Sequence, residues 1–203
     1  MSQRSVADDF VGAPAHSLAA VLRLRAFRRL WIGLGLSSLG DWLGLLALTA
    51  FAGELAGAGY AEKNFAIAGV LFLRVVPAVV IGPLAGYVAD RLDRRLNLIV
   101  GDLLRFVLFA SIPIVSTVLG DDRRGQALAW VFVVTVLVEA ISLVWLPTKD
   151  ATVPNLVPRD RLEAANQLSL VTTYGSALPA AGIFTLLTAW TQNIGSLLGR
   201  FDP

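Results

Sequence analysis

The sequence predicts an all-α membrane protein that crosses the bilayer about five times. Hydrophobic residues make up 56% of the 203 residues and charged residues only 16%, whereas soluble domains carry about 25% charged residues. Apolar runs of the length that a helix needs to cross the hydrocarbon core recur along the chain, about 20 residues each. These runs lack the strict alternation of a β-barrel strand, so helices are expected.

The apolar runs divide the chain into a tail, a helical bundle and a second tail. Residues 1–26 are polar and mixed, and we expect them to form a cytoplasmic N-terminal tail. The transmembrane bundle is expected over residues 27–190, with spans at about 30–52, 65–89, 98–119, 127–146 and 168–190. Residues 191–203 are too short and too polar for a sixth span and are expected to form a C-terminal tail.

The positive charges predict how the chain is oriented in the membrane. With the N-terminus in the cytoplasm, the inside segments hold eleven Arg and Lys residues and the outside segments hold four. Because cytoplasmic loops carry the excess of positive charge, this orientation is favoured. Arg is far more frequent than Lys in the sequence, which is typical of a bacterial genome rich in G and C. We therefore expect a multi-pass protein of the bacterial inner membrane.

Several function classes are excluded by missing residues. The sequence has no Cys and one His, so it offers neither a thiolate nor a histidine metal cluster. It has no phosphate-binding Gly-x-x-x-x-Gly-Lys-Ser/Thr loop, which argues against a self-contained ATP-driven pump. No nucleophile with a neighbouring base is visible. We expect no enzymatic activity, no cofactor, no metal and no nucleic acid; the expected partners are the lipid bilayer and a small-molecule substrate.

A charged segment, GYVADRLDRR, follows the second apolar run as residues 86–95. Its charge alone fits an ordinary cytoplasmic loop. The residue order, however, resembles the signature loop of the major facilitator superfamily, Gly-x-Leu-Ala-Asp-Arg-x-Gly-Arg-Arg/Lys, which lies between the same two helices. Val88 replaces the Leu and Asp93 replaces the second Gly, and we expect Asp93 to keep the turn in a left-handed conformation. Gly86 is expected to allow close contact between helices.

The resemblance implies a gating role for this loop. In the superfamily its Asp interacts with a helix of the C-terminal half and stabilises the outward-open state, and Asp90 is the matching position. The gating-loop candidates are Gly86, Asp90, Arg91, Arg94 and Arg95. The superfamily fold has two bundles of six helices, so the chain is expected to be a truncated N-terminal bundle. Its expected partner is then the missing C-terminal half or another chain.

A second segment, PTKDATVPNLVPRDRLEAANQL at residues 147–168, strengthens the resemblance. It is similar to the connector of drug-efflux and siderophore-export members, in which a Pro-rich stretch leads to a Leu-x-x-Ala-Asn pattern. The opening of the first span, FRRLWIGLGLSSLGDW, resembles the same branch. We expect Asp160 and Glu163 to form a variant capping box that starts a helix after Pro158.

Three charged residues within the spans are the candidates for transport or coupling. A charge at mid-membrane costs about 2.5–3.5 kcal/mol on insertion scales, so each one needs a reason. Asp41 and Arg74 lie at similar depths and are expected to form an ion pair, either structural or part of a pathway. Glu139 has no evident partner at its depth, so it either binds a proton or cation or makes a structural hydrogen bond. The third span is expected to carry charges only at its inner end.

Polar residues recur at helical spacing in three spans, which predicts a central cavity. The cavity-lining candidates are Ser37, Thr49, Thr135, Ser142, Asn166, Ser169, Thr173 and Ser176. Ordinary hydrogen bonding between helices is the alternative explanation of each stripe. In the fifth span, residues 175–182 partly resemble the antiporter motif of the superfamily. The small residues beside Pro179 allow a kink and close packing, and plain packing of small residues is the alternative explanation.

The resemblance and the polar pattern together predict a secondary active transporter that exports small molecules in exchange for protons by alternating access. The alternative is a truncated, non-transporting membrane protein or a half-transporter subunit that needs a partner chain. The sequence does not identify the substrate.

Overall fold

The computed structural model describes residue 18 and residues 21–198, with side chains described for residues 18, 21–89 and 91–192. Within these ranges the chain is helical apart from short connections, and no strand occurs there. The helices are α2 (Arg25–Leu55), α3 (Tyr60–Arg91), α4 (Arg94–Leu119), α5 (Arg124–Leu156), α6 (Leu162–Gly175) and α7 (Ala177–Leu198). Short 3₁₀ turns, η2 (Asp121–Arg123) and η3 (Arg159–Arg161), precede α5 and α6.

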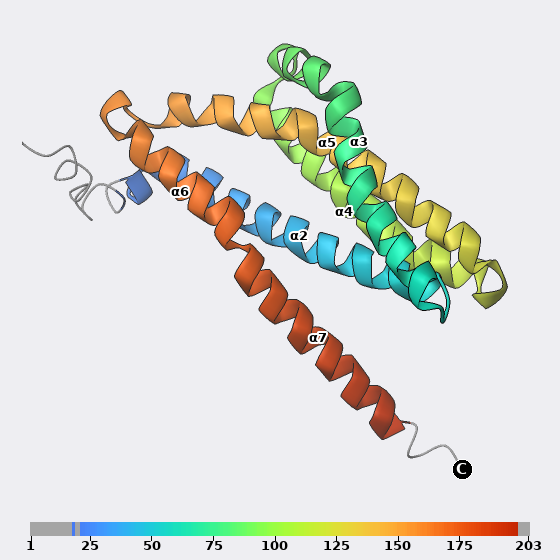
Figure 1. Cartoon of the computed structure of the whole chain (residues 1–203). Helices are drawn as coiled ribbons and strands as arrows, with labels where there is room; N and C mark the ends of the chain where they lie inside the picture. Colours follow the sequence, from blue (N-terminus) through green and yellow to red (C-terminus); the bar gives the residue numbers. More distant parts are fainter. Residues whose placement is uncertain (1–17, 19–20, 199–203) are drawn as a thin grey trace, which may run out of the picture.

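Five helical segments of the described residues are long and apolar enough to cross a membrane, which confirms the predicted fold class. Helices α2, α3, α4 and α5 each form one of these segments, and η3, α6 and α7 form the fifth. Helix α5 packs along both α3 and α4, and α2 closes the bundle on the side that faces α6 (Figure 1). Helix α7 diverges from α3, α4 and α5 (Figure 1), and its main contacts are with α2.

Helix α5 extends well beyond the predicted span, to Leu156 through Pro147 and Pro154. The sequence predicts a connector there, so this expectation is wrong. Proline is tolerated in a membrane helix when other donors supply the carbonyls near it. At this turn Thr148 Oγ1 and Asn97 Nδ2 both donate to the Val144 carbonyl oxygen, at 2.8 and 3.4 Å.

The fifth span is broken at Ser176, where α6 ends and α7 begins. Pro179 explains the break, because it has no N–H and its ring clashes with the carbonyl four residues earlier, at Gly175. The kink that these residues allow is therefore present. Helix α7 continues to Leu198, so most of the expected C-terminal tail is helical, and residues 199–203 lie outside the described residues.

Two predicted helix starts differ from the structure. Asp93 is the N-cap of α4, with φ −60°, and its carboxylate accepts a hydrogen bond of 2.8 Å from the Leu96 N–H. The left-handed conformation expected at Asp93 is therefore wrong; an Asp fits here because its side chain caps the helix. Helix α6 has no side-chain cap, and Glu163 accepts a hydrogen bond from Gln167 instead, so the predicted capping box is wrong.

The buried apolar side chains form two clusters at opposite ends of α2. One cluster joins the start of α2 to the end of α5 and the start of α6, with Phe27, Val153 and Ala165 at its centre. The other joins the end of α2 to α3, α4 and α5, with Ala52 and Val131 among its fully buried members. The polar residues of the spans lie between these two clusters.

Close helix contacts occur at glycines other than the predicted one. A Cβ on Gly44 would lie 2.5 Å from the Phe109 ring, so α2 and α4 approach each other closely there. A Cβ on Gly101 would lie 3.0 Å from the Trp145 ring, between α4 and α5. A Cβ on Gly86 would meet nothing within 4 Å, so the close contact expected at Gly86 is not made within the described part of the chain.

Candidate transport cavity

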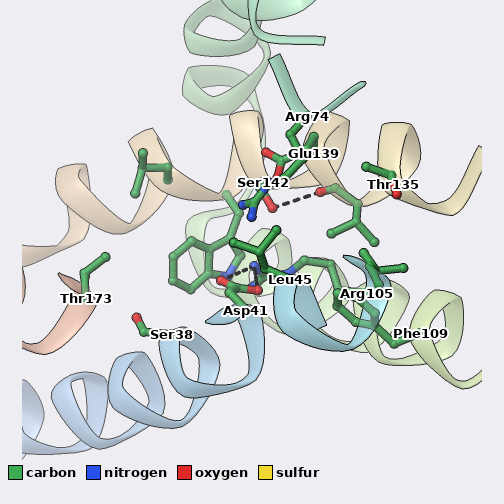
Figure 2. A pocket seen from close by; sticks show the side chains of 14 residues that line it. Ser38, Asp41, Leu45, Arg74, Arg105, Phe109, Thr135, Glu139, Ser142 and Thr173 are labelled. Carbon is green, nitrogen blue, oxygen red and sulfur yellow. Dashed lines mark hydrogen bonds and ion pairs between the residues drawn. The ribbon is translucent and has the colours of Figure 1, made fainter. Parts of the chain in front are cut away.

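A polar cavity of about 170 Å³ lies between the two apolar clusters (Figure 2). An adjoining cavity of about 150 Å³ shares four of its five lining residues with the first, so the two form one polar space. The polar and charged lining residues of the first cavity are Ser38, Asp41, Arg74, Arg105, Thr135, Glu139, Ser142 and Thr173. Trp42 lines the adjoining one. Side chains from α2, α3, α4, α5 and α6 therefore converge on this space.

Arg105 is the most deeply buried charge of the site, with 3% of the residue exposed. Its Nη1 donates to both carboxylate oxygens of Asp41, at 2.8 and 2.9 Å. Its Nη2 donates to Ser37 Oγ at 2.8 Å and to the Asp102 carboxylate. The guanidinium carbon also lies 4.8 Å from the centre of the Trp145 ring, a cation–π distance. Arg105 therefore binds α4 to α2 and α5 at mid-bundle.

Two carboxylates share this single guanidinium. Asp41 approaches from α2 and Asp102 from the preceding turn of α4, and Ser37 Oγ donates to Asp102 Oδ1 at 3.0 Å. The Asp41 and Asp102 side chains are 38% and 46% exposed. We call Asp41, Asp102, Arg105 and Ser37 the Arg105 cluster. With both acids ionised, its net charge is −1.

A second ion pair joins α3 to α5 across the cavity. Arg74 Nε donates to Glu139 Oε1, and the two side chains are 34% and 18% exposed. This is one cation for one carboxylate, and it is the only ion pair that Arg74 makes among the described residues. Figure 2 shows Arg74 and Glu139 together on the side of the cavity away from Asp41.

The predicted Asp41–Arg74 ion pair is wrong, because Asp41 pairs with Arg105 and Arg74 pairs with Glu139. The statement that Glu139 lacks a partner is wrong for the same reason. The charges expected only at the inner end of the third span are Asp102 and Arg105, but the Arg105 side chain reaches Asp41 in the middle of α2. The signal for this was the i, i+3 spacing of Asp102 and Arg105, which places an acid beside the arginine on one helix face.

The predicted cavity-lining residues divide into four groups. Thr135, Ser142 and Thr173 line the cavity, and the Thr135 and Ser142 hydroxyls also donate to carbonyls of their own helix. Ser37 belongs to the Arg105 cluster. Thr49, Ser169 and Ser176 donate to carbonyls of their own helices and do not line the cavity, and Asn166 is exposed. Ser38 and Trp42 line the space but were not predicted; Trp42 Nε1 donates to the Thr173 carbonyl oxygen at 2.8 Å, near the break between α6 and α7.

Three buried side-chain atoms of the described residues have no hydrogen-bond partner: Arg105 Nε, Trp145 Nε1 and Thr173 Oγ1. All three residues line the same cavity. Buried polar atoms are nearly always paired with protein or water, and a polar space of this size has room for water. These three atoms are therefore polar groups beside the cavity that the described side chains leave without a partner.

The gating-loop candidates lie at the junction of α3 and α4. Arg91 lies over the Tyr87 ring, with its guanidinium carbon 4.2 Å from the ring centre. Arg94 Nη1 donates to the Ala151 carbonyl oxygen at 2.9 Å, which connects this junction to the end of α5. Arg95 is exposed. Asp90 lies in α3, but its side chain is outside the described residues.

The geometry defines a class of protein: a multi-pass α-helical membrane protein with charged groups around a cavity at mid-bundle. Comparison with known proteins identifies the family. The family profile described as "Transmembrane secretion effector" (MFS_3) matches residues 16–191. The chain belongs to this family of the major facilitator superfamily, as the signature loop predicts.

Two similar proteins are named as MFS-type transporters. The chain is 27% identical over 159 residues to "Uncharacterized MFS-type transporter YfiS" of Bacillus subtilis, covering 77% of this chain and 34% of that protein. It is 28% identical over 188 residues to "Uncharacterized MFS-type transporter Rv0037c" of Mycobacterium tuberculosis, covering 90% of this chain and 40% of the relative. The chain thus spans about a third to two-fifths of these relatives. No solved structure matches it.

Proposed function

We propose that the chain forms part of a secondary active transporter of the bacterial inner membrane, with its N-terminus in the cytoplasm. It exports small molecules in exchange for protons by alternating access. The observation that carries this proposal is the convergence of Asp41, Arg74, Arg105 and Glu139, from four helices, on one cavity between two apolar ends.

The energetic cost of these charges supports a transport role. Charged side chains at mid-membrane are expensive and usually mark a substrate or ion pathway. Here they line a polar space rather than a closed, fully paired core, since three buried polar atoms around it lack partners. Secondary transporters place their substrate and coupling-ion sites at mid-membrane in this manner.

The proposal includes a gating role for the loop between α3 and α4. Arg94 donates to the Ala151 carbonyl and Asn97 donates to Thr148, so the first turn of α4, directly after the loop, is bound to the cytoplasmic end of α5. The same helix carries Glu139 in the cavity. A movement of the loop is thereby transmitted to the charged site. We expect Asp90→Asn to impair transport while leaving membrane insertion intact; unchanged transport would contradict the gating role.

The proposal also requires a second helical bundle, because alternating access needs two units that move around a central site. That bundle belongs either to further sequence of the same protein or to another chain. The relatives favour the first arrangement, since each is more than twice as long as the part that matches. A non-transporting protein or a half-transporter subunit is the competing function.

Proton-coupled export is tested in inverted membrane vesicles from bacteria that produce the protein. Respiration acidifies the vesicles, and quenching of acridine orange reports the proton gradient. Ethidium and carboxyfluorescein serve as cationic and anionic test cargo. Proton-coupled export predicts that one of these cargoes restores the dye fluorescence, and that vesicles without the protein show no such response. Restoration by neither would contradict the proposed export of small organic ions.

The water-filled cavity is tested separately by labelling introduced cysteines, which is direct because the sequence has no Cys. Ser38→Cys and Thr173→Cys are expected to react with a hydrophilic methanethiosulfonate reagent, since both positions line the cavity. Leu178→Cys, on an 82% exposed apolar position of α7, is the lipid-facing control and is expected to react slowly. Equal rates at all three positions would contradict a hydrated cavity.

A further inference from the structure

We propose that Asp41 and Asp102 together bind one exchangeable proton, held over the shared guanidinium of Arg105. This inference rests on the proposed function and names the coupling site within it. It assigns a role to Asp102, which is not among the coupling candidates predicted from the sequence, and it removes Glu139 from the coupling step.

The first argument is the charge balance of the groups that line the cavity, taken together with Asp102, which pairs with the cavity-lining Arg105 but does not itself line the cavity. Helix α2 contributes Asp41, α3 contributes Arg74, α4 contributes Asp102 and Arg105, and α5 contributes Glu139. Helix α6 contributes only the neutral Thr173 to the cavity lining, and the sequence of α7 has no charged residue. Three carboxylates therefore face two guanidinium groups, which leaves one negative charge in excess.

The second argument locates the excess charge. Glu139 has Arg74 as a partner of its own, so this pair is balanced. Asp41 and Asp102 divide the hydrogen bonds of Arg105 between them. Two carboxylates that share one site do not both ionise readily, because the like charges repel. The uncompensated charge therefore lies in the Arg105 cluster, and binding of one proton brings that cluster from −1 to neutral.

The third argument is access to water. Arg105 is 97% buried by residue area, yet its Nε has no partner, and neither has the Trp145 Nε1 beside it. Both residues line the cavity that also exposes Asp41. The cavity has room for water, and Asp41 lines it, so a proton reaches this carboxylate through the cavity. Ser37 Oγ, which accepts from Arg105 and donates to Asp102, couples the two carboxylates to each other.

The proposal predicts an effect that independent acids would not show. Removal of either carboxylate leaves one acid with one guanidinium, a balanced pair that stays ionised. Asp41→Asn and Asp102→Asn should therefore each abolish the same proton uptake, and the double variant should lose no more than either single variant. Independent sites would instead give losses that add.

The experiment measures proton uptake by the purified protein in lipid nanodiscs, with a pH-indicator dye, after a step from alkaline to mildly acidic buffer in which exposed carboxylates stay ionised. His16 and the N-terminal amine also bind protons in this step, and their uptake is common to all variants. Above that common uptake, wild type should take up about one proton per chain. Asp41→Asn, Asp102→Asn and the double variant should each lack this additional proton. Asp121→Asn, which removes an exposed acid outside the cavity, is the control and should behave as wild type.

Two results would overturn the proposal: uptake unchanged in Asp102→Asn, or uptake lost only in Glu139→Gln. Circular dichroism establishes that each variant is folded. If Asp41→Asn does not fold, Asp102→Asn and Asp102→Ser carry the test, because Asp102 is the more exposed acid. Failure of this proposal is distinct from failure of the proposed function. If only the proton site is wrong, the vesicles still couple proton movement to cargo export. If the transport mechanism is wrong, the purified protein still takes up the proton but the vesicles show no coupling to cargo.

Discussion

The two arginines of the cavity are held in contrasting ways. Arg105 is 3% exposed, donates to three side chains and lies against an aromatic ring. Arg74 is about one-third exposed in its side chain and has one carboxylate partner. Arg105 is held by several contacts but pairs with two carboxylates, so its cluster has an excess negative charge. Arg74 pairs with one carboxylate, so its charge is balanced, and it has fewer contacts. The difference indicates that Arg105 holds the helices of the site together, while the Arg74–Glu139 pair is a simpler contact between α3 and α5.

The largest expected effect comes from removing Arg105. Arg105→Ala leaves Asp41 and Asp102 without their shared partner. Breaking a fully buried ion pair on one side costs about 3–5 kcal/mol, and we expect the lower end because solvent screens the two acids, which are 38% and 46% exposed. Unfolding of the detergent-solubilised protein, followed by circular dichroism, should show this loss or no folded protein at all. Arg124→Ala, which breaks an exposed pair with Asp121, is the control and should cost about 0–1 kcal/mol. Equal effects would contradict the special role of Arg105.

Breaking the Arg74–Glu139 pair should cost less. Glu139→Gln leaves Arg74 with a neutral partner and a path to cavity water, so we expect a loss of about 1–3 kcal/mol. The pH dependence of transport should persist, because Glu139 is balanced by Arg74 and the excess charge lies elsewhere. A pH profile of transport in vesicles tests this. A flattened profile in Glu139→Gln would reverse the assignment of the two sites.

A change beside Arg105 that leaves every charge in place sharpens the comparison further. Gly101→Ala puts a Cβ about 3.0 Å from the Trp145 ring, which must shift away from Arg105. Overpacking of this kind costs about 1–3 kcal/mol, and we expect the lower end because the ring edge is able to move. Tryptophan emission should change with it. Gly69→Ala, which crowds Phe132 to the same distance beside the α3–α5 contact, should leave the emission of Trp145 unchanged.

The smallest effect is expected at the start of α4, away from both arginines. Asp93→Ala removes the side-chain acceptor of the Leu96 N–H, and loss of an N-cap costs about 0.5–2 kcal/mol. Thermal unfolding should show a small decrease, and Asp93→Ser should restore most of it. Proton uptake should not change in either variant. A changed uptake would mean that the loop and the Arg105 cluster are coupled energetically.

The fold was predictable because hydrophobic length and loop charge act locally along the chain. The five spans and the signature loop are predicted from the sequence alone, without information about which helices pack together. The helix ends were less predictable: Pro147 appeared to end the fourth span, yet Thr148 and Asn97 supply donors at that turn. The kink beside Pro179 was predictable because the missing N–H acts on its own helix.

The candidate site was only partly predictable, because pairing depends on helix packing. The depth of Asp41 and of Arg74 was estimated along separate helices, and depth alone does not tell which faces meet. Helix α4 brings Arg105 against α2, so the Arg105 guanidinium forms the ion pair with Asp41. The length of an arginine side chain also matters, since it carries the charge well away from its own Cα. Of the predicted stripes, Thr135, Ser142 and Thr173 face the cavity.

A double-mutant cycle on Asp41 measures the central claim, that this acid is held by Arg105 and not by Arg74. Asp41→Asn is combined with Arg105→Gln in one cycle and with Arg74→Gln in the other, and the free energy of unfolding is measured for each variant. We predict a coupling energy between positions 41 and 105 that lies within the range of about 0.5–3 kcal/mol seen for contacting residues, and a coupling between 41 and 74 below about 0.5 kcal/mol. A larger coupling of Asp41 to Arg74 than to Arg105 would contradict this assignment of the cavity.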